Sequence, residues 1–284
     1  MAIEKIAVIG AGTMGHGIAQ VAAQSGFDVT LVDVNEDSVA RGLAAIRANL
    51  KKGVERGKLT EAEAEQTISR LRTSVDSEEA AAEADLIVEA IIEKLDLKRE
   101  LFKKLDRVSK PGCVLATNTS SLSISAIASA TTRPDLVIGM HFFNPVHIMK
   151  LVEIVVAPTT SQQTLEAALA VARRMGKEAI TVKDTPGFAT SRLGIALGME
   201  AIRMLEEGVA SAQDIDKAMV LGYNHPMGPL RLTDLVGLDI RLSIAEYLFE
   251  KLGSEAFRPP EILRKKVGEG KLGKKTGEGF YKWE

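Results

Sequence analysis

Residues 3–20 have the sequence IEKIAVIGAGTMGHGIAQ, and this stretch sets the class of the fold. Its apolar run IAVI, typical of a buried strand, is followed by Gly10, Gly12 and Gly15 in the spacing GxGxxG and then by a helical pattern. In such a turn the first glycine permits the tight bend, the second lets the backbone approach a pyrophosphate, and the third lets the helix pack on the strand. The helix N-terminus adds amide donors and a positive dipole end. Together these features predict a dinucleotide-binding site.

Asp33 closes the next strand-like run, DVTLVDV. It lies at about the 20-residue interval expected for a carboxylate that holds the ribose hydroxyls of the dinucleotide. The same charge would repel a 2′-phosphate, so the sequence favours NAD over NADP. The predicted cofactor contacts are Gly10, Gly12, Thr13, Met14, Gly15 and Asp33.

Residues 1–184 alternate strand-like runs with helical segments, which predicts a Rossmann-like, doubly wound parallel sheet. The runs are IEKIAVIG, DVTLVDV, DLIVEAI, GCVLATN and LVIGMHF. Between Asp33 and Asp85 the spacing is too long for a single crossover. An apolar stripe from Val39 to Val54, and a capping box at Thr60 and Glu63 followed by Ala64, Ile68 and Leu71, predict a helical hairpin over residues 38–71.

From residue 185 to 284 the strand-like runs cease and helical periodicity continues. We therefore expect an all-helical C-terminal domain. Its helices carry more Leu, Ile, Met and Val than one layer against the sheet domain can bury, which predicts a homodimer formed through this domain.

The composition excludes several classes of protein. A net charge of −2 argues against a nucleic-acid-binding protein, and no apolar stretch approaches the roughly 20 residues that span a bilayer. The single cysteine, Cys113, cannot form an intramolecular disulfide, and residues 1–10 lack the pattern of a signal peptide. These features predict a cytoplasmic protein without a membrane partner, and no metal site is expected.

The segment HFFNPVHIMKLVE, residues 141–153, carries the candidate catalytic groups. His141 directly follows the strand-like run DLVIGM, so it should lie at the carboxyl edge of the sheet, where ligands bind in open α/β folds. Histidine can accept a proton from an alcohol near neutral pH. Glu153 lies in a second apolar run, where a partner histidine would offset the cost of burying the carboxylate charge. The carboxylate would in turn orient the histidine ring. A solvent-facing Glu153 on an edge strand is the alternative.

Five motifs in register resemble those of the L-3-hydroxyacyl-CoA dehydrogenase family, most closely its bacterial members that act on 3-hydroxybutyryl-CoA. They are GAGTMGHGIAQ, TNTSSLSI, HFFNPVHIMKLVEIV, DTPGF and GKKTGEGFY, and they cover essentially the whole chain. The resemblance implies NAD-dependent, reversible oxidation of the 3-hydroxyl group of an (S)-3-hydroxyacyl-CoA, a two-domain fold and a dimer formed through the helical domain.

The same resemblance assigns roles to individual residues. It makes His141 the general base and Glu153 its orienting partner, while Ser120 and Asn144 match positions that bind the substrate oxygen. His147 matches no catalytic position. Glu93 and Lys98 match positions near the nicotinamide and the substrate, with a solvated helix start as the alternative. The hairpin lysines, as candidates for the CoA phosphates or simply a charged solvent face, are Lys51, Lys52 and Lys58.

One position departs from the family pattern. The chain has Ser191 where the family commonly has Asn, which changes one expected substrate contact. Two other functions remain open on the sequence: a sugar-acid (gulonate) dehydrogenase of the lambda-crystallin type, and a non-catalytic NAD-binding protein.

Overall fold

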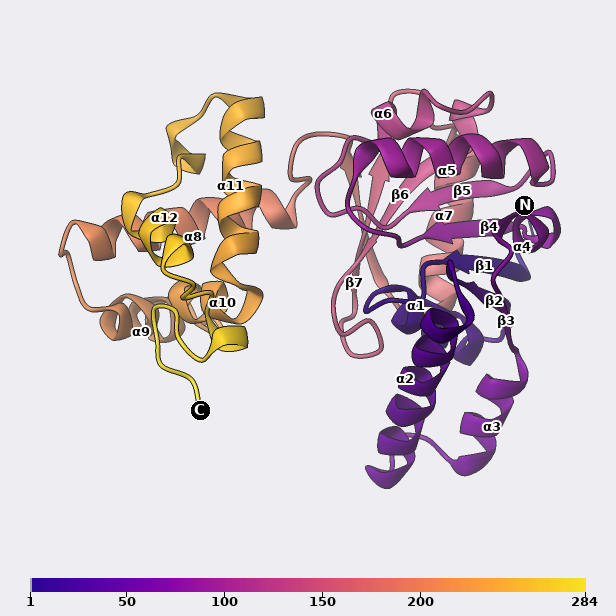
Figure 1. Cartoon of the computed structure of the whole chain (residues 1–284), viewed down its shortest axis with the longest axis horizontal. Helices are drawn as coiled ribbons and strands as arrows, with labels where there is room; N and C mark the ends of the chain where they lie inside the picture. Colours follow the sequence, from indigo (N-terminus) through magenta and orange to yellow (C-terminus); the bar gives the residue numbers. More distant parts are fainter. Residues whose placement is uncertain (1) are drawn as a thin grey trace. The chain divides into compact units, whose positions relative to one another are not determined.

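The computed structural model describes residues 2–284, so Met1, which begins the predicted first domain, lies outside the described residues. The chain divides into two compact units, one ending at Thr185 and the other beginning at Pro186 (Figure 1). Within this described part, no helix has both the length and the apolar character needed to cross a membrane.

The first unit is built on an eight-stranded sheet with the order β3-β2-β1-β4-β5-β6-β7-β8. The strands are β1 (Lys5–Ile9), β2 (Asp28–Val32), β3 (Leu71–Ser74), β4 (Leu86–Glu89), β5 (Val114–Thr117), β6 (Val137–Phe142), β7 (Leu151–Val156) and β8 (Glu178–Lys183). Neighbouring strands are parallel except for β6 and β7. The predicted α/β class is therefore confirmed, although the sheet is not purely parallel. The connection from Phe142 to Leu151 is too short for a parallel crossover, which needs about a dozen residues.

Helices cover both faces of this sheet, which explains why β4 and β5 are buried along their whole length. They are α1 (Gly15–Gln24), α4 (Ser77–Glu83), α5 (Leu95–Val108), α6 (Ile124–Ala128) and α7 (Gln162–Arg174), with a short 3₁₀ turn at Pro134–Leu136. Small side chains of α1 and α7, such as Ala22 and Ala168, share one apolar core with Val8 and Ile154 of the strands.

The predicted helical hairpin is present as α2 (Glu36–Glu55) and α3 (Glu61–Ser69) (Figure 1). The capping box is confirmed, because the Thr60 hydroxyl accepts from the Glu63 backbone N–H and the Glu63 carboxylate accepts from that of Thr60. The C-terminal boundary was wrong, since Leu71 begins β3 and is not a member of the apolar face of α3. This strand is short and half polar, LRTS, and it forms because β2 offers it a parallel partner.

The second unit contains no strand of the sheet. Its helices are α8 (Thr190–Glu206), α9 (Ala212–Gly222), α10 (Pro229–Val236), α11 (Leu238–Leu252) and α12 (Glu261–Gly268), with 3₁₀ turns at Glu255–Phe257 and Lys274–Thr276. Buried Asp234 holds the C-terminal tail, because its carboxylate accepts from the backbone N–H groups of Phe280 and Tyr281 and from Trp283 Nε1.

Candidate functional site

The glycine-rich turn between β1 and α1 is fixed by close backbone approaches. At Gly10, where φ is 104°, a Cβ atom would lie 2.6 Å from the carbonyl oxygen of Ala90, and at Gly15 it would lie 1.7 Å from that of Gly10. At Gly12 a Cβ atom would meet no described atom within 4 Å. Gly10 and Gly15 are therefore required by the turn itself, whereas the open face of Gly12 suits the approach of a ligand phosphate.

Asp33 is tied to this turn. Its Oδ2 accepts from the backbone N–H of Ala11 at 2.7 Å, and its Oδ1 accepts from that of Val34 at 2.7 Å. Each carboxylate oxygen has a second acceptor direction, so the group can also accept from two ribose hydroxyls. The turn, the helix N-terminus and Asp33 thus fit the pyrophosphate and ribose of a dinucleotide.

His141 and Glu153 form a buried pair. They face each other in the register of β6 and β7, and the distance from His141 Nδ1 to Glu153 Oε2 is 2.7 Å. Glu153 is 0% exposed and His141 is 8% exposed. The alternative of a solvent-facing Glu153 is wrong, because β8 pairs with β7 and covers that edge.

A hollow of about 360 Å³ lies in front of His141 at the carboxyl edge of the sheet. Polar side chains from several strand ends converge there: His141 from β6, Asn144 just beyond it, and Asn118 and Ser120 from the loop after β5. Its complete lining is Met14, Ala90, Ile91, Glu93, Asn118, Ser120, His141, Phe142, Phe143 and Asn144. Three separate segments of the chain, which carry Glu93, Ser120 and the pair His141 and Asn144, therefore meet at one hollow.

Asn118 and Asp184 fix the loop that carries Ser120. Asn118 Oδ1 accepts from the backbone N–H of Phe142 at 2.8 Å, which links the ends of β5 and β6. The Asp184 carboxylate accepts from the backbone N–H groups of Ile124 and Ser125 and from the hydroxyl of Ser123. The loop is thus anchored at both ends.

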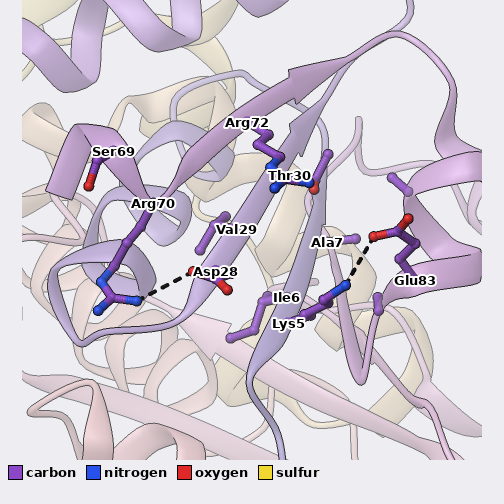
Figure 2. A pocket seen from close by; sticks show the side chains of 12 residues that line it. Lys5, Ile6, Ala7, Asp28, Val29, Thr30, Ser69, Arg70, Arg72 and Glu83 are labelled. Atoms are coloured by element: carbon purple, nitrogen blue, oxygen red, sulfur yellow. Dashed lines mark hydrogen bonds and ion pairs between the residues drawn. The ribbon is translucent and has the colours of Figure 1, made fainter. Parts of the chain in front are cut away.

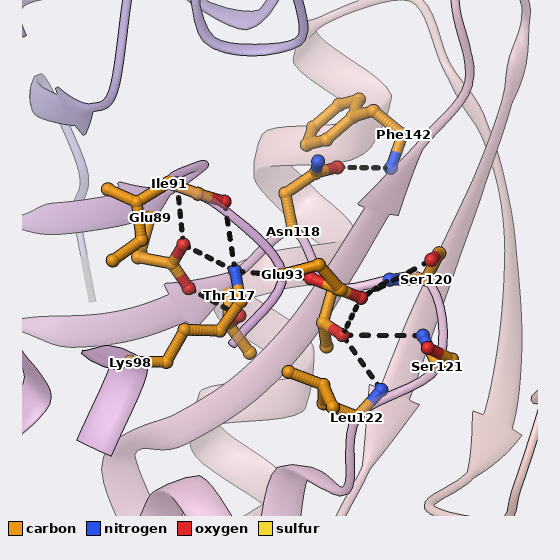
Figure 3. Close-up of polar contacts among 11 residues, drawn as sticks. Glu89, Ile91, Glu93, Lys98, Thr117, Asn118, Ser120, Ser121, Leu122 and Phe142 are labelled. Atoms are coloured by element: carbon orange, nitrogen blue, oxygen red, sulfur yellow. Dashed lines mark hydrogen bonds and ion pairs between the residues drawn. The ribbon is translucent and has the colours of Figure 1, made fainter. Parts of the chain in front are cut away.

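A network of charged groups lies beside this loop (Figure 3). Lys98 is fully buried, and its Nζ lies 2.6 Å from Oε1 of the equally buried Glu89 and 3.4 Å from Oε2 of Glu93. Glu93 is partly exposed, and its Oε1 accepts from Thr119 Oγ1 at 2.6 Å and from the backbone N–H of Ser120 at 2.9 Å. Glu93 therefore belongs to the hollow, whereas Lys98 lies behind it.

A second, basic hollow lies between the hairpin and the loop after β6. It is lined by Asn49, Lys52, Gly53, Arg56, Lys58, His147 and Ile148. Lys52 and Lys58 were expected in such a place, but Lys51 does not line it and lies 4.0 Å from Glu55. Burial, followed by the positive groups of His16, Lys177 and Lys58, lowers the pKa of His147.

The opposite, amino-terminal edge of the sheet also carries a hollow (Figure 2). Four of its five charged side chains are paired, since Arg70 lies 3.3 Å from Asp28 and Lys5 lies 3.1 Å from Glu83. Such partly exposed pairs are typical of a solvated surface, and the hollow is at the wrong end of the strands to meet His141. Among residues 2–284 no group of three His, Cys, Asp or Glu side chains could hold a metal ion.

Two family profiles match nearly the whole chain. The NAD binding domain of 3-hydroxyacyl-CoA dehydrogenase matches residues 5–185, and the C-terminal domain matches residues 187–283. The chain belongs to the 3-hydroxyacyl-CoA dehydrogenase family. It is 49% identical over 284 residues to a probable 3-hydroxybutyryl-CoA dehydrogenase of Bacillus subtilis, with 100% of this chain and 99% of that protein covered.

Two further proteins are similar over most or all of their length. The human mitochondrial hydroxyacyl-coenzyme A dehydrogenase is 46% identical over 288 residues, which cover 99% of this chain and 92% of that protein. The crystal structure of (S)-3-hydroxybutyryl-CoA dehydrogenase from Ralstonia eutropha superposes with a TM-score of 0.96 at 40% identity, and both chains are fully covered. The predicted family is confirmed, and with it the NAD-binding nature of the first unit.

The sequence prediction missed three polar groups that the structure places in or beside the two hollows: Glu89, Arg56 and Asn118. A signal was present for Glu89, which stands in the run DLIVEAI among Ile87, Val88 and Ala90, just as Glu153 stands among apolar residues. No comparable signal marked Arg56, which caps the C-terminus of α2. Ser191 lies in the first turn of α8 in the second unit and is half-buried.

Proposed function

We propose that the protein catalyses the reversible, NAD-dependent oxidation of (S)-3-hydroxyacyl-CoA, with 3-hydroxybutyryl-CoA as a substrate, to the 3-ketoacyl-CoA. The observation that carries the proposal is the buried pair of His141 and Glu153 at the hollow that also contains Ser120 and Asn144. A buried acid–base pair at the carboxyl edge suits proton transfer at that edge.

In this proposal His141 acts as the general base. Its Nδ1 faces Glu153, so we assign Nε2 to the substrate, where it takes the proton of the 3-hydroxyl group. Glu153 holds the ring orientation and stabilises the imidazolium that forms, as a carboxylate does in a catalytic triad. Bound NAD supplies the oxidant that accepts the hydride from C3. In the reverse direction His141 returns the proton to the oxygen.

Ser120 and Asn144 bind the substrate oxygen in the proposed reaction. Both side chains can donate to an oxygen that gains negative charge when the ketone is reduced, and both line the hollow with His141. Gly12 and Asp33 hold the pyrophosphate and the adenine ribose of NAD, and Glu93 lies nearer the reacting end.

We assign the basic hollow beside the hairpin to the CoA phosphates. Three positive charges lie in this hollow, on Lys52, Arg56 and Lys58. His147 adds a fourth positive charge when it is protonated. The exposed Ile148 offers an apolar surface beside these charges. This assignment keeps Lys52 and Lys58 of the predicted contacts and replaces Lys51 with Arg56.

For assembly we propose a homodimer formed by the second unit. Several large apolar side chains of that unit are exposed in the single chain: Leu193, Leu221, Tyr223, Leu232, Leu235, Val236 and Ile240. Burial of such a set against a second copy would stabilise a dimer. Light scattering measures the mass, and a monomer at micromolar concentration would exclude the proposal.

The test of the reaction is the formation of NADH when the protein is mixed with NAD and (S)-3-hydroxybutyryl-CoA. Longer 3-hydroxyacyl-CoA substrates and gulonate serve as comparisons. No NADH with any acyl-CoA, together with NADH from gulonate, would replace the proposal with the sugar-acid alternative.

A further inference from the structure

Glu89 and Lys98 form an ion pair with no exposure to solvent, directly behind the hollow of His141 (Figure 3). A buried ion pair contributes little net stability compared with well-packed apolar side chains of similar volume. Its place beside Glu93, which lines the hollow, therefore calls for a role other than stability.

The carboxylate of Glu89 is held from several directions. Oε1 accepts from Lys98 Nζ at 2.6 Å and from the backbone N–H of Ile91 at 2.7 Å, while Oε2 accepts from Thr117 Oγ1 at 2.7 Å. The carbonyl oxygen of Ile91 lies 3.4 Å from Lys98 Nζ. Glu89 thus fixes both the ammonium group of Lys98 and the backbone that leads to Glu93.

The two carboxylate oxygens of Glu93 contact different partners: one faces Lys98 and the other faces the loop after β5. Oε2 lies 3.4 Å from Lys98 Nζ. Oε1 accepts from Thr119 Oγ1, from the backbone N–H of Ser120 and, at 3.3 Å, from Ser120 Oγ. The position of Lys98 therefore determines which oxygen of Glu93 faces Ser120.

We propose that Glu89 is a positioning residue, which acts through Lys98 on Glu93 and through Glu93 on Ser120. This inference rests on the proposed function, because it assigns Glu93 and Ser120 to the bound cofactor and substrate. Loss of the Glu89 charge leaves Glu93 as the only described carboxylate near Lys98, and the buried ammonium then draws Glu93 away from Ser120.

The experiment compares Glu89→Gln with a matched variant, Asp106→Asn. Asp106 is also a nearly buried carboxylate with a cationic partner, since its Oδ1 lies 2.8 Å from Arg133 Nε, and it lies on α5 with Lys98 but outside the hollow. Each variant loses one buried carboxylate charge that has a cationic partner. A purely structural role predicts the same outcome for both: lower thermal stability with unchanged binding.

For Glu89→Gln we expect kcat/KM with acyl-CoA to fall at least about tenfold, mostly through KM, because His141 and Glu153 are untouched. The Kd of NADH, measured by its fluorescence without any substrate, should also rise. For Asp106→Asn both KM and this Kd should equal those of the wild type. Unchanged KM and Kd in Glu89→Gln would overturn the proposal.

If Glu89→Gln does not fold, the variant Thr117→Val tests the proposal in its place. It keeps every charge and removes only the hydrogen bond to Glu89 Oε2, so we expect a few-fold rise in the KM of acyl-CoA. No rise would overturn the proposal. If the wild-type protein is inactive with every acyl-CoA, the proposed function is refuted instead. The role of Glu89 is then tested separately by comparing the Kd of NADH for Glu89→Gln with that for Asp106→Asn.

Discussion

His141 and Glu153 face each other directly across the antiparallel strands β6 and β7, with Nδ1 of the histidine 2.7 Å from Oε2 of the glutamate. Because Glu153 is fully buried, a proton or a hydrogen bond from His141 is the natural compensation for its charge. The pairing also fixes which ring nitrogen can serve a substrate.

Replacement of His141 by Gln should lower kcat by roughly 10²- to 10⁴-fold, because the proposed general base is lost while the dinucleotide turn is unchanged. NADH fluorescence should show near-normal cofactor binding. The control is His147→Gln, which should retain most of kcat, since His147 lies in the basic hollow and not beside Glu153. A large loss of kcat in His147→Gln with an active His141→Gln would reverse the assignment.

The cofactor preference should depend on Asp33. We expect a higher kcat/KM with NAD than with NADP, because a 2′-phosphate would bring a second negative charge to a carboxylate that already accepts from Ala11 N. Asp33→Ala should lower the ratio of kcat/KM with NAD to kcat/KM with NADP, mainly by lowering kcat/KM with NAD. Equal efficiency of the two cofactors in the wild type would exclude Asp33 as the ribose ligand.

The basic hollow predicts a pH-dependent contribution of His147 to CoA binding. Its pKa is lowered chiefly by burial and then by nearby positive groups, so the free protein holds it mostly neutral at pH 7. A bound phosphate favours the protonated form and raises this pKa, so the contribution of His147 grows as pH falls.

The measurement is the Kd of CoA at several pH values for the wild type and for His147→Gln. The phosphate titrates in both experiments, so the Kd of His147→Gln divided by the Kd of the wild type isolates the contribution of His147. This ratio should increase as pH falls from about 7.5 to 5.5. Arg56→Gln should weaken binding throughout this range. A constant ratio would remove His147 from the CoA site.

Asp106 should contribute stability that is lost in acid. Burial raises the pKa of its carboxyl group, but hydrogen bonds from Thr132 and the ion pair with Arg133 outweigh burial and hold the pKa below its usual value. A depressed pKa stabilises the fold above the unfolded-state pKa of about 3.9, and this stability is lost as pH falls through the lower folded-state pKa.

Asp106→Asn should therefore lower the free energy of unfolding by about 1.5–3 kcal/mol near pH 7. The difference from the wild type should shrink as pH falls from about 5 toward 3. Urea denaturation at each pH gives both values. A difference that stays constant over this range would mean that the charge of Asp106 does not matter.

Replacement of Ser191 should change KM more than kcat. Asn has a longer arm with two donors and one acceptor, whereas Ser has one hydroxyl nearer the backbone. We expect Ser191→Asn to change KM by a few-fold to about tenfold, for acetoacetyl-CoA or for a longer 3-ketoacyl-CoA, with kcat largely kept. If neither constant changes for either substrate, residue 191 does not contact the ligand.

The sequence alone determined the features that depend on near neighbours in the chain. The glycine spacing after IAVI, the apolar runs and the Thr60–Glu63 capping box each involve residues that are close in sequence, so their pattern could be recognised directly. The α/β class and the helical C-terminal part followed from these patterns, and the family followed from the resemblance of the five motifs; all three are confirmed.

Only the tertiary structure decided contacts between distant segments. The strand β3 exists because β2 pairs with it, and Glu89 meets Thr117 because β4 and β5 are adjacent in register. Arg56 and His147 share a hollow although the sheet strands β3 to β6 separate them in the chain. Such neighbours are set by strand order and helix packing, which no local pattern encodes, so the sequence could nominate His141 but could not reveal the network behind Glu93.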